Sequence, residues 1–484
     1  MIVITEKDAK IEYEKDAANY IGSAATVYLP ETIDEIATIV RQLYTTGEPI
    51  TVSAARTGLT GGGVSSEGAI ISMERLDKII SIDKEKKTAV LEPGVRLQNF
   101  HDELKQYGLF YPSNPTEVWS TIGGNVANNA SGAKTYKYGA TREFVNYLEV
   151  VLPTGDEVHL YRGQCIANGN IAQINTISGD RIEFEIPFVH QPNVTKNAAG
   201  LFLRANMDII DLFIGSEGTL GIIKKIGLNL LTATEEVVSA ILFMEDYDST
   251  LKLVSYLRST NKVEPRLIEY FDHNSLKLLS EHQNDIPTNA KAAVWIEVET
   301  NADLVEQTME DIYNISVETG ALADETWIAV SEKDRKRITE FRHNLPLSVN
   351  ELLTKYGQRK IYTDTAVPVE YFDTYYRLMY QKLEELELDY VVFGHIGDCH
   401  LHANLFVKSD EEKSKAEFFY NYMVDNAIEN NGTFSAEHGV GKIKRPFMTK
   451  MYSEEELNGM RKVKEAIDPK YLFGRDTIFL YREL

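Results

Sequence analysis

The sequence has few cysteines and no excess of positive charge. Only Cys165 and Cys399 occur among 484 residues, which excludes a disulfide scaffold and favours a reducing compartment. The formal net charge is −23, because 73 acidic residues oppose 50 basic ones. Such a chain repels phosphate backbones and anionic lipid headgroups, so nucleic acid and membrane surfaces are poor partners. A small anionic substrate would need locally concentrated positive charge.

Long apolar runs are also absent. No stretch reaches about 18 consecutive apolar residues, so the sequence predicts no transmembrane segment. Residues 1–8 lack a basic segment followed by an apolar one, and therefore do not have the pattern of a signal peptide. These features predict a cytoplasmic protein. At roughly 100–200 residues per domain, the length predicts two to four domains.

Three segments rich in glycine and small polar residues occur in the first half of the chain, at 53–64, 120–132 and 215–223. In the first segment, four glycines fall within positions 58–63. Their amide groups can turn inward and approach a pyrophosphate closely. The pattern is neither G-x-G-x-x-G nor a Walker loop, so the usual nucleotide-binding folds are not indicated. Three such segments predict one extended ligand held by several loops.

Histidines are concentrated near the C-terminus. Four of the ten lie between residues 395 and 438. Residues 390–393 and 401–407 have the composition of two strands, and Gly397-Asp398 has that of a turn between them. The segment is therefore predicted to form a hairpin.

A metal site follows from this arrangement. If residues 397–400 form the loop, His395 and His402 are cross-strand neighbours with Cβ atoms about 5 Å apart. The Glu437 carboxylate would complete a three-ligand site for Zn²⁺, with Mn²⁺ or Fe²⁺ as alternatives, and leave a position open for substrate. Asn404 would lie on the same strand face as His402. The alternative is an exposed polar hairpin without a metal.

The glycine-rich segments, followed by the histidine hairpin, resemble the FAD-dependent 2-hydroxyacid dehydrogenases of the vanillyl-alcohol oxidase superfamily. The similar segments are 57–62, 122–127, 215–221 and 394–398, and the resemblance runs over nearly the whole chain. The matching branch contains D-lactate dehydrogenase, the glycolate oxidase FAD subunit and D-2-hydroxyglutarate dehydrogenase.

The resemblance implies FAD as cofactor. We expect non-covalent binding, because no histidine lies in or beside the glycine-rich segments. The loop 56–63 would take the pyrophosphate, and residues 121–125 would lie near the isoalloxazine ring. The implied FAD-binding residues are Arg56, Thr57, Gly58, Leu59, Thr60, Gly61, Gly62, Pro115, Thr116, Thr121, Gly123, Gly124, Asn125, Asn128, Ser131, Gly132, Glu217, Gly221 and Ile222.

The resemblance also implies a substrate site and a reaction, the oxidation of a D-2-hydroxyacid to the 2-oxoacid. Arg342 and Lys360 would bind the carboxylate, with Arg359 as an alternative to Lys360. Asn404 would hydrogen-bond the substrate. The metal ion would lower the pKa of the 2-hydroxyl group, His438 would accept its proton, and the hydride would pass to the flavin.

Several alternatives stay open. D-lactate is the favoured substrate, and D-2-hydroxyglutarate and glycolate are alternatives. A quinone, an electron-transfer flavoprotein, an iron–sulfur partner or a cytochrome would accept the electrons, and a homodimer is one option for assembly. A non-redox enzyme of the alkyl-dihydroxyacetonephosphate synthase type would also use FAD and a histidine-rich motif. A metal- or flavin-storing module without activity is the third interpretation.

The predicted fold class is α+β. Residues 1–232 would form an FAD-binding domain of the vanillyl-alcohol oxidase type with two α+β subdomains, and 233–433 a cap with an antiparallel sheet covered by helices. Residues 434–484 would return to the first domain. Amphipathic spacing predicts helices at 30–45, and at 304–319 with Leu304 on the apolar side. A further helix is expected between Pro346 and Gln358.

Three segments depart from the family pattern. Residues 162–196 form a longer polar insertion, which we expect to be an elaborated surface loop. Cys399-His400 stands where relatives commonly have Gly-Asn, and His400 is expected to be a surface residue or a partner of the ligands; an extra ligand is the less favoured alternative. Gly474-Arg475 replaces a usual Asn-Pro pair, so no flavin contact is expected from an asparagine there.

Overall fold

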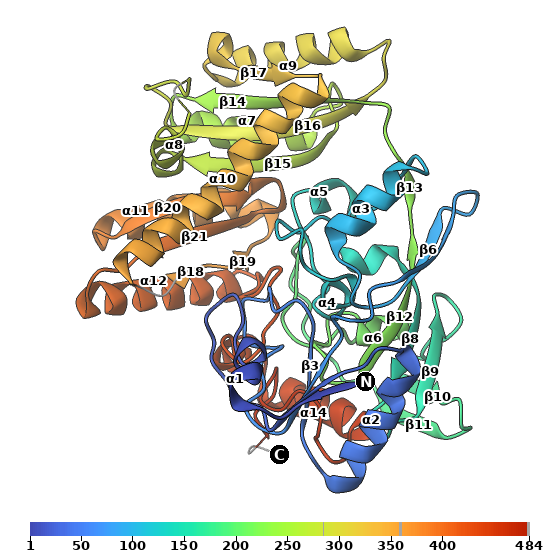
Figure 1. Ribbon diagram of the computed structural model, residues 1–484. Coiled ribbons are helices and arrows are strands. Elements are labelled where there is room, and N and C mark those ends of the chain that lie inside the picture. The colour runs from blue at the N-terminus through green and yellow to red at the C-terminus, as the bar shows by residue number, and fades with distance from the viewer. Residues whose placement is uncertain (284, 358–360, 482–484) are drawn as a thin grey trace.

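The computed structural model describes residues 1–283, 285–357 and 361–481. Helices and strands alternate along the chain, and this confirms the predicted α+β class. Figure 1 shows the two ends of the chain together in the lower part of the molecule, and the segment from β14 to α12 in the upper part. In the part of the chain that the structure describes, no helix is long and apolar enough to cross a membrane.

A four-stranded mixed sheet opens the fold, in the order β1-β2-β4-β3. Strand β1 pairs antiparallel with β2, and β4 pairs parallel with β2 and β3. Helix α2 buries Ile36, Ile39 and Val40 in the adjoining core, as its apolar spacing predicts. The bounds are β1 Ile2–Ile4, β2 Thr26–Leu29, α2 Ile33–Thr46, β3 Ile50–Ser53 and β4 Ala69–Ser72; the short helix α1 spans Lys7–Lys10.

A five-stranded antiparallel sheet follows, in the order β5-β6-β12-β8-β9. The second glycine-rich segment contains helix α4, and the third leads into strand β12. The bounds are β5 Ile79–Asp83, β6 Thr88–Leu91, α3 Leu97–Lys105, β7 Leu109–Phe110, α4 Ile122–Ala127, α5 Thr135–Tyr138, β8 Val145–Val151, β9 Glu157–Tyr161, α6 Ile210–Phe213, β12 Ile222–Asn229 and β13 Leu231–Thr232, which pairs with β7.

The insertion at 162–196 is more than a surface loop, contrary to expectation. It contains the hairpin β10 (Ile171–Asn175) and β11 (Arg181–Glu185). Along β10 every second residue is buried, so Ala172 and Ile174 enter the main core of the lower part. The polar segments 163–165 and 178–180, which suggested a loop, lie outside the two strands.

The upper part is built on an eight-stranded sheet in the described chain, in the order β17-β14-β16-β15-β20-β21-β18, with β19 beside β21. All its pairings are antiparallel. The bounds are β14 Glu236–Met244, β15 Pro265–Asp272, β16 Ala292–Thr300, β17 Trp327–Ala329, β18 Ile361–Tyr362, β19 Thr365–Ala366, β20 Asp389–His395 and β21 His400–Phe406.

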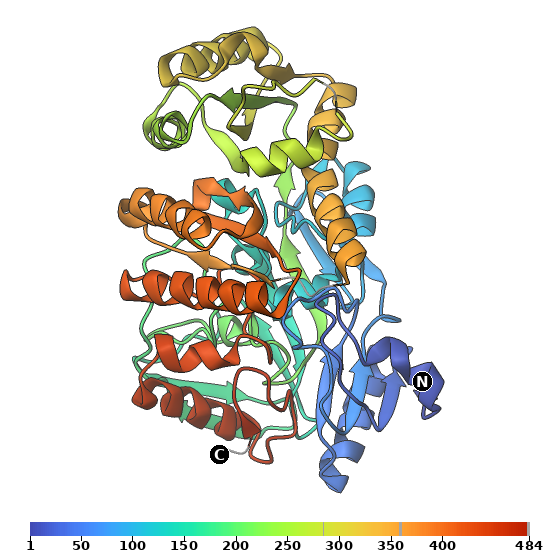
Figure 2. The same cartoon turned by 90° about the vertical axis from the view of Figure 1, so that its left-hand side faces the viewer.

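Helices cover both faces of this sheet (Figure 2). Alternate residues of β14 enter two separate cores, because successive side chains of a strand point to opposite faces. One core includes residues of α7 (Tyr247–Ser259), α9 (Val305–Thr319), α11 (Val369–Glu385) and α12 (Asp410–Glu429). The other includes residues of α8 (His273–Leu279) and α10 (Glu332–Tyr356).

Helices α9 and α10 differ from the sequence prediction. Helix α9 buries Ile312 and Ile315, but Leu304 precedes the helix and is 51% exposed. The helix expected only after Pro346 is the long helix α10, which contains Pro346. A proline removes one backbone donor, but the neighbouring apolar residues Leu345 and Val349 are fully buried and hold the helix against the sheet.

The C-terminal segment packs into the lower part of the molecule. Phe434 is fully buried there, and helix α14 (Glu454–Ile467) contributes Leu457, Met460 and Val463 to the same core. The short helix α13 (Met448–Met451) precedes it. The exact domain boundaries after residues 232 and 433 stay predictions.

Phe434 provides a test of this packing. Phe434→Ala should lower the free energy of unfolding by about 3–5 kcal/mol, because it removes a buried ring and leaves a cavity. Phe418 is 54% exposed on α12, so Phe418→Ala is the matched control. Thermal unfolding followed by circular dichroism would measure both variants. Equal, small shifts in the two melting temperatures would contradict the packing of the C-terminal segment.

Candidate functional site

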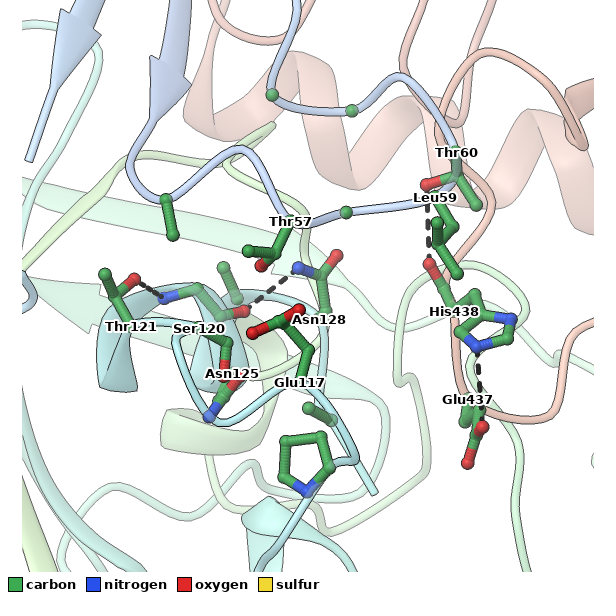
Figure 3. A pocket seen from close by; sticks show the side chains of 18 of the residues that line it. Thr57, Leu59, Thr60, Glu117, Ser120, Thr121, Asn125, Asn128, Glu437 and His438 are labelled. Atoms are coloured by element: carbon green, nitrogen blue, oxygen red, sulfur yellow. Dashed lines mark hydrogen bonds and ion pairs between the residues drawn. The ribbon is translucent and has the colours of Figure 1, made fainter. Parts of the chain in front are cut away.

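The glycine-rich segments and the histidine hairpin line one cavity of about 340 Å³, within the usual range for ligand pockets. In Figure 3, Thr121 lies on one side of this cavity, Glu437 and His438 lie on the other, and Thr57 and Asn128 lie between them. The lining includes most of the predicted FAD-binding residues, namely Arg56, Thr57, Gly58, Leu59, Thr60, Gly62, Pro115, Thr116, Thr121, Gly123, Gly124, Asn125, Asn128, Ser131, Glu217 and Gly221.

Three predicted FAD-binding residues do not line the cavity. Gly61 has a positive φ of 78° and donates its amide hydrogen to Asp16. Gly132 packs so closely on Asn114 that a Cβ atom would lie 2.1 Å from the Asn114 carbonyl oxygen. Ile222 is fully buried among apolar side chains. These three residues lie behind the lining and support the conformation of the loops.

The cavity has the polar lining that a polar cofactor requires, because several side-chain atoms beside it have no hydrogen-bond partner in the described chain. Ser53 Oγ, Ser120 Oγ and Asn125 Nδ2 are buried, line the cavity, and have no hydrogen-bond partner among the described residues. Buried polar groups of native proteins nearly always have a partner, and a polar cofactor in the adjoining cavity would be one source of it. Thr121 Oγ1 instead accepts the amide hydrogen of Gly124 at 3.1 Å and caps α4.

The histidine hairpin has a register different from the predicted one. Its turn is a short 3₁₀ helix at Ile396–Asp398, followed by Cys399 with a positive φ of 55°. The direct partner of His395 is therefore His400, and His402 lies opposite Phe393. His400 is fully buried, so its prediction as a surface residue is wrong.

Four side chains of this region gather their donor atoms within 4.8 Å of one another: His395, His400, His402 and Glu437. Glu437 Oε2 lies 3.3 Å from His395 Nε2 and 3.9 Å from His400 Nδ1. Glu437 Oε1 lies 3.1 Å from His402 Nε2. We call these four residues the histidine–glutamate group.

Each histidine of the group has an oxygen at its other ring nitrogen. Glu269 Oε1 lies 2.5 Å from His395 Nδ1, and the Thr363 carbonyl oxygen lies 2.9 Å from His402 Nδ1. Asp364 Oδ1 lies 3.0 Å from His400 Nε2. Metal-binding histidines commonly donate their second ring hydrogen to such an oxygen, which fixes the ring and its tautomer. The histidine–glutamate group thus has donor chemistry that fits a divalent metal ion.

Burial and neighbouring charges set the protonation of the group. Burial lowers the pKa of His400 to about 3 and also lowers the pKa of His402. Burial opposes the protonation of His395 as well, but the Glu269 carboxylate outweighs it and raises that pKa to about 9. Burial likewise opposes the ionisation of Glu437, yet positive neighbours hold its pKa well below the usual value.

The charged side chains around the group carry a surplus of one negative charge when the histidines are neutral. Lys196 Nζ is fully buried and lies 3.2 Å from Asp398 Oδ2 and 3.4 Å from Glu437 Oε2. A divalent ion would replace the proton of His395 and change this balance from −1 to +1. The carboxylates are Glu269, Asp364, Asp398 and Glu437, and the cations are Lys196, Arg342 and Lys444.

His438 lies at the edge of the group and is held by Asp364. Its Nδ1 atom lies 3.2 Å from Asp364 Oδ2, and its amide hydrogen is donated to the same oxygen. Lys444 pairs with this carboxylate from the other side. The His438 ring stacks on His402 with 5.4 Å between centroids, and its side chain is 20% exposed.

Arg342 and Asn404, two of the predicted substrate-binding residues, both line the cavity. Arg342 donates from Nε to Glu269 at 2.9 Å, while its buried Nη1 has no hydrogen-bond partner in the described chain. Asn404 donates to the His402 carbonyl oxygen, and its Oδ1 is similarly unpaired among the described residues. Lys360 and its alternative Arg359 lie outside the described residues.

The sequence interpretation missed several charged residues of the site. The sequence assigns no role to Asp364, or to Lys196 at the end of the insertion. Glu269 lies on β15, in a strand without any motif. A charged residue inside an otherwise apolar strand, such as Glu269 between Ile268 and Tyr270, is the one signal that could have identified it.

Comparisons with known proteins show which family the chain matches. Family models match at residues 24–161, an FAD binding domain, and at 233–477, the C-terminal domain of FAD linked oxidases. Glycolate oxidase subunit GlcD of Bacillus subtilis (strain 168) is 28% identical over 97% of this chain and 92% of its own length. D-lactate dehydrogenase of Anaerostipes hadrus is 28% identical over 98% and 94%. The solved alkyldihydroxyacetonephosphate synthase shares the fold, with a TM-score of 0.67 at 16% identity over 98% of this chain and 81% of that one.

The buried Glu217, which lines the cavity, makes the stability of the folded protein depend on pH. Its carboxylate accepts the amide hydrogens of Val440 and Gly441, each at 2.8 Å, and burial raises its pKa to about 7. In an unfolded chain the pKa of glutamate is about 4.3. The folded state therefore holds a proton that the unfolded state has lost between these values, and stability falls as pH rises through 7.

Glu217→Gln should reduce this pH dependence, because an amide does not titrate. We expect the melting temperature of the natural chain to fall more between pH 5 and pH 8 than that of Glu217→Gln. Glu85 is exposed, so Glu85→Gln is the control and should keep the slope of the natural chain. Parallel slopes for the Glu217→Gln variant and the natural chain would contradict the assignment.

Proposed function

The chain belongs to the family of FAD-linked oxidases, and we propose that it oxidises a D-2-hydroxyacid, with D-lactate as first candidate, to the corresponding 2-oxoacid. The observation that carries this proposal is the single cavity lined both by the glycine-rich segments and by Arg342, His402, Glu437 and His438. A flavin on one side and a hydroxyacid on the other would share this space.

Arg342 would bind the substrate carboxylate. Arg342 lines the cavity, and Glu269 holds its guanidinium at Nε while Nη1 has no hydrogen-bond partner among the described residues. The planar guanidinium matches the geometry of a carboxylate. In the proposal Lys360 supplies a second positive charge.

A small monocarboxylate fits the described cations better than a dicarboxylate. The arginines of the described lining are Arg56 and Arg342, and Arg56 already pairs with Glu74 at 3.0 Å. D-2-hydroxyglutarate would bring a second carboxylate without an unpaired arginine among these residues. D-lactate and glycolate have no second carboxylate. The names of similar relatives do not separate the three compounds, because they include enzymes for each of them.

The 2-hydroxyl group would lie between the histidine–glutamate group, Asn404 and His438. His395, His402 and Glu437 would hold a divalent ion, with Zn²⁺ the first candidate, and this ion would lower the pKa of the hydroxyl group. Asn404, which lines the same cavity, would hydrogen-bond the substrate and orient it.

His438 would accept the hydroxyl proton. Asp364 contacts its Nδ1, so Nε2 is the nitrogen that faces Glu437 Oε1, at 3.4 Å, and the substrate. A carboxylate at one ring nitrogen orients the imidazole and stabilises its protonated form, as a general base requires. FAD, when bound, takes up the hydride from C2, so two electrons and one proton leave the carbon while the hydroxyl proton goes to His438.

Anaerobic mixing with a panel of D- and L-2-hydroxyacids tests the proposed reaction. The purified protein should be yellow, and it should release FAD on denaturation if the expected non-covalent binding holds. D-lactate or glycolate should bleach the flavin absorbance, and L-lactate should not. A flavin-loaded protein that no hydroxyacid on the panel bleaches would contradict the proposal and favour non-redox chemistry.

His438→Asn should slow flavin reduction by at least 100-fold, because general base catalysis typically contributes about 10²–10⁴. Stopped-flow absorbance would give the rate at saturating substrate and the concentration for half-maximal rate. The half-saturating substrate concentration should change much less than the rate. His159 lies on β9 outside the cavity lining, so His159→Asn is the control and should react normally. A reduction rate within threefold of normal for His438→Asn would refute its role.

Arg342→Lys tests the proposed contact with the substrate carboxylate. A lysine keeps the positive charge but loses the planar fork, so we expect the half-saturating hydroxyacid concentration to rise by 10-fold or more. The same stopped-flow experiment measures it. The exposed Arg337 on the same helix gives the control Arg337→Lys, which should leave this concentration unchanged. An unchanged value for Arg342→Lys would exclude the assigned contact.

A further inference from the structure

We propose that His400 is a fourth protein ligand of the metal site, so that this chain holds its ion with three histidines and Glu437. The inference rests on the metal role in the proposed function, and it gives that site a ligand beyond His395, His402 and Glu437.

The position of His400 favours this role. It is the direct cross-strand partner of His395 and precedes His402 by two residues, so all three rings lie on one face of the hairpin. Ring centroids of His400 lie 4.4 Å from His402 and 5.4 Å from His395. No solvent reaches the ring, since His400 is fully buried.

The hydrogen bonding of His400 is incomplete without an ion. Neither ring nitrogen has a well-aligned hydrogen bond among the described residues. Nε2 lies 3.0 Å from Asp364 Oδ1, so we place the ring hydrogen on Nε2. Nδ1 then carries a lone pair that faces Glu437 Oε2 at 3.9 Å, a distance too long for a hydrogen bond. An unpaired buried nitrogen costs free energy, and a metal ion would satisfy it.

The three histidines have the same pattern of contacts at their two ring nitrogens. Each has an oxygen at the ring nitrogen that points away from the group, from Glu269, Thr363 or Asp364. This arrangement is typical of metal-binding histidines and leaves the other nitrogen of each ring toward the centre. If His400 only supported the other ligands, it would donate to one of them. At 3.9 Å from Glu437, it does not.

The spacing also fits a metal centre. Ligands about 2.0–2.1 Å from a tetrahedral zinc ion are separated by roughly 3.4 Å. The nitrogens of His402, His395 and His400 lie 3.1, 3.3 and 3.9 Å from the Glu437 oxygens, and these distances bracket that value. With four protein ligands, the substrate hydroxyl would be a fifth ligand, and catalytic zinc sites sometimes expand to five ligands.

Zinc affinity of His400→Asn tests the proposal. Competition with a coloured chelator would give the dissociation constant, and elemental analysis the zinc content of the FAD-loaded protein. Loss of partners outside the ligand set typically costs about 10–100-fold in affinity, so loss of a ligand should cost more than 100-fold. His101 lies on α3 outside the group, and His101→Asn should change the affinity less than threefold. A loss below 100-fold for His400→Asn would overturn the proposal, as would a natural chain that binds no zinc.

X-ray absorption of the zinc-loaded natural chain gives an independent result if the variant does not fold. The scattering should require three imidazole rings per zinc, and two rings would overturn the inference. This result is separable from the proposed reaction. If the scattering shows three imidazole rings per zinc but no hydroxyacid bleaches the flavin, only the proposed function is wrong. If a hydroxyacid bleaches the flavin but the scattering shows two rings, only the role of His400 is wrong.

Discussion

The carboxylate of Glu437 is the interaction on which the site depends. It joins His395 and His402 from the upper sheet to Lys196 from the insertion and Ser131 from the second glycine-rich segment. Burying a carboxylate is costly unless charged and hydrogen-bonding partners surround it. The lower and upper parts of the molecule each supply partners, so the site forms only when both parts are in place.

A chain of ion pairs extends from this carboxylate to the other end of the cavity. His395 joins Glu437 to Glu269, and Glu269 in turn holds Arg342. The residues proposed for the hydroxyl and the carboxylate of the substrate are therefore fixed relative to each other. Such fixed spacing favours one length of substrate between the two groups, because a catalytic group must lie within hydrogen-bond reach of the atom on which it acts.

The sequence predicted what depends on local pattern, including helix α2, the glycine-rich segments that meet at one cavity, and a strand that turns His402 and Asn404 to one face. It could not give the register of the hairpin, because the tight turn and the left-handed Cys399 bring His400 opposite His395. The contacts of Lys196 with the site are tertiary, between segments more than 200 residues apart. No local pattern encodes them.

The central claim is that the flavin cavity and the histidine–glutamate group serve one reaction. The most direct test is the rate at which a D-2-hydroxyacid reduces the bound flavin, measured at full FAD occupancy while zinc is removed stepwise and then restored. The account predicts that the rate falls in proportion to the zinc lost and recovers when zinc is returned. Undiminished flavin reduction in the zinc-free, FAD-loaded protein would contradict it.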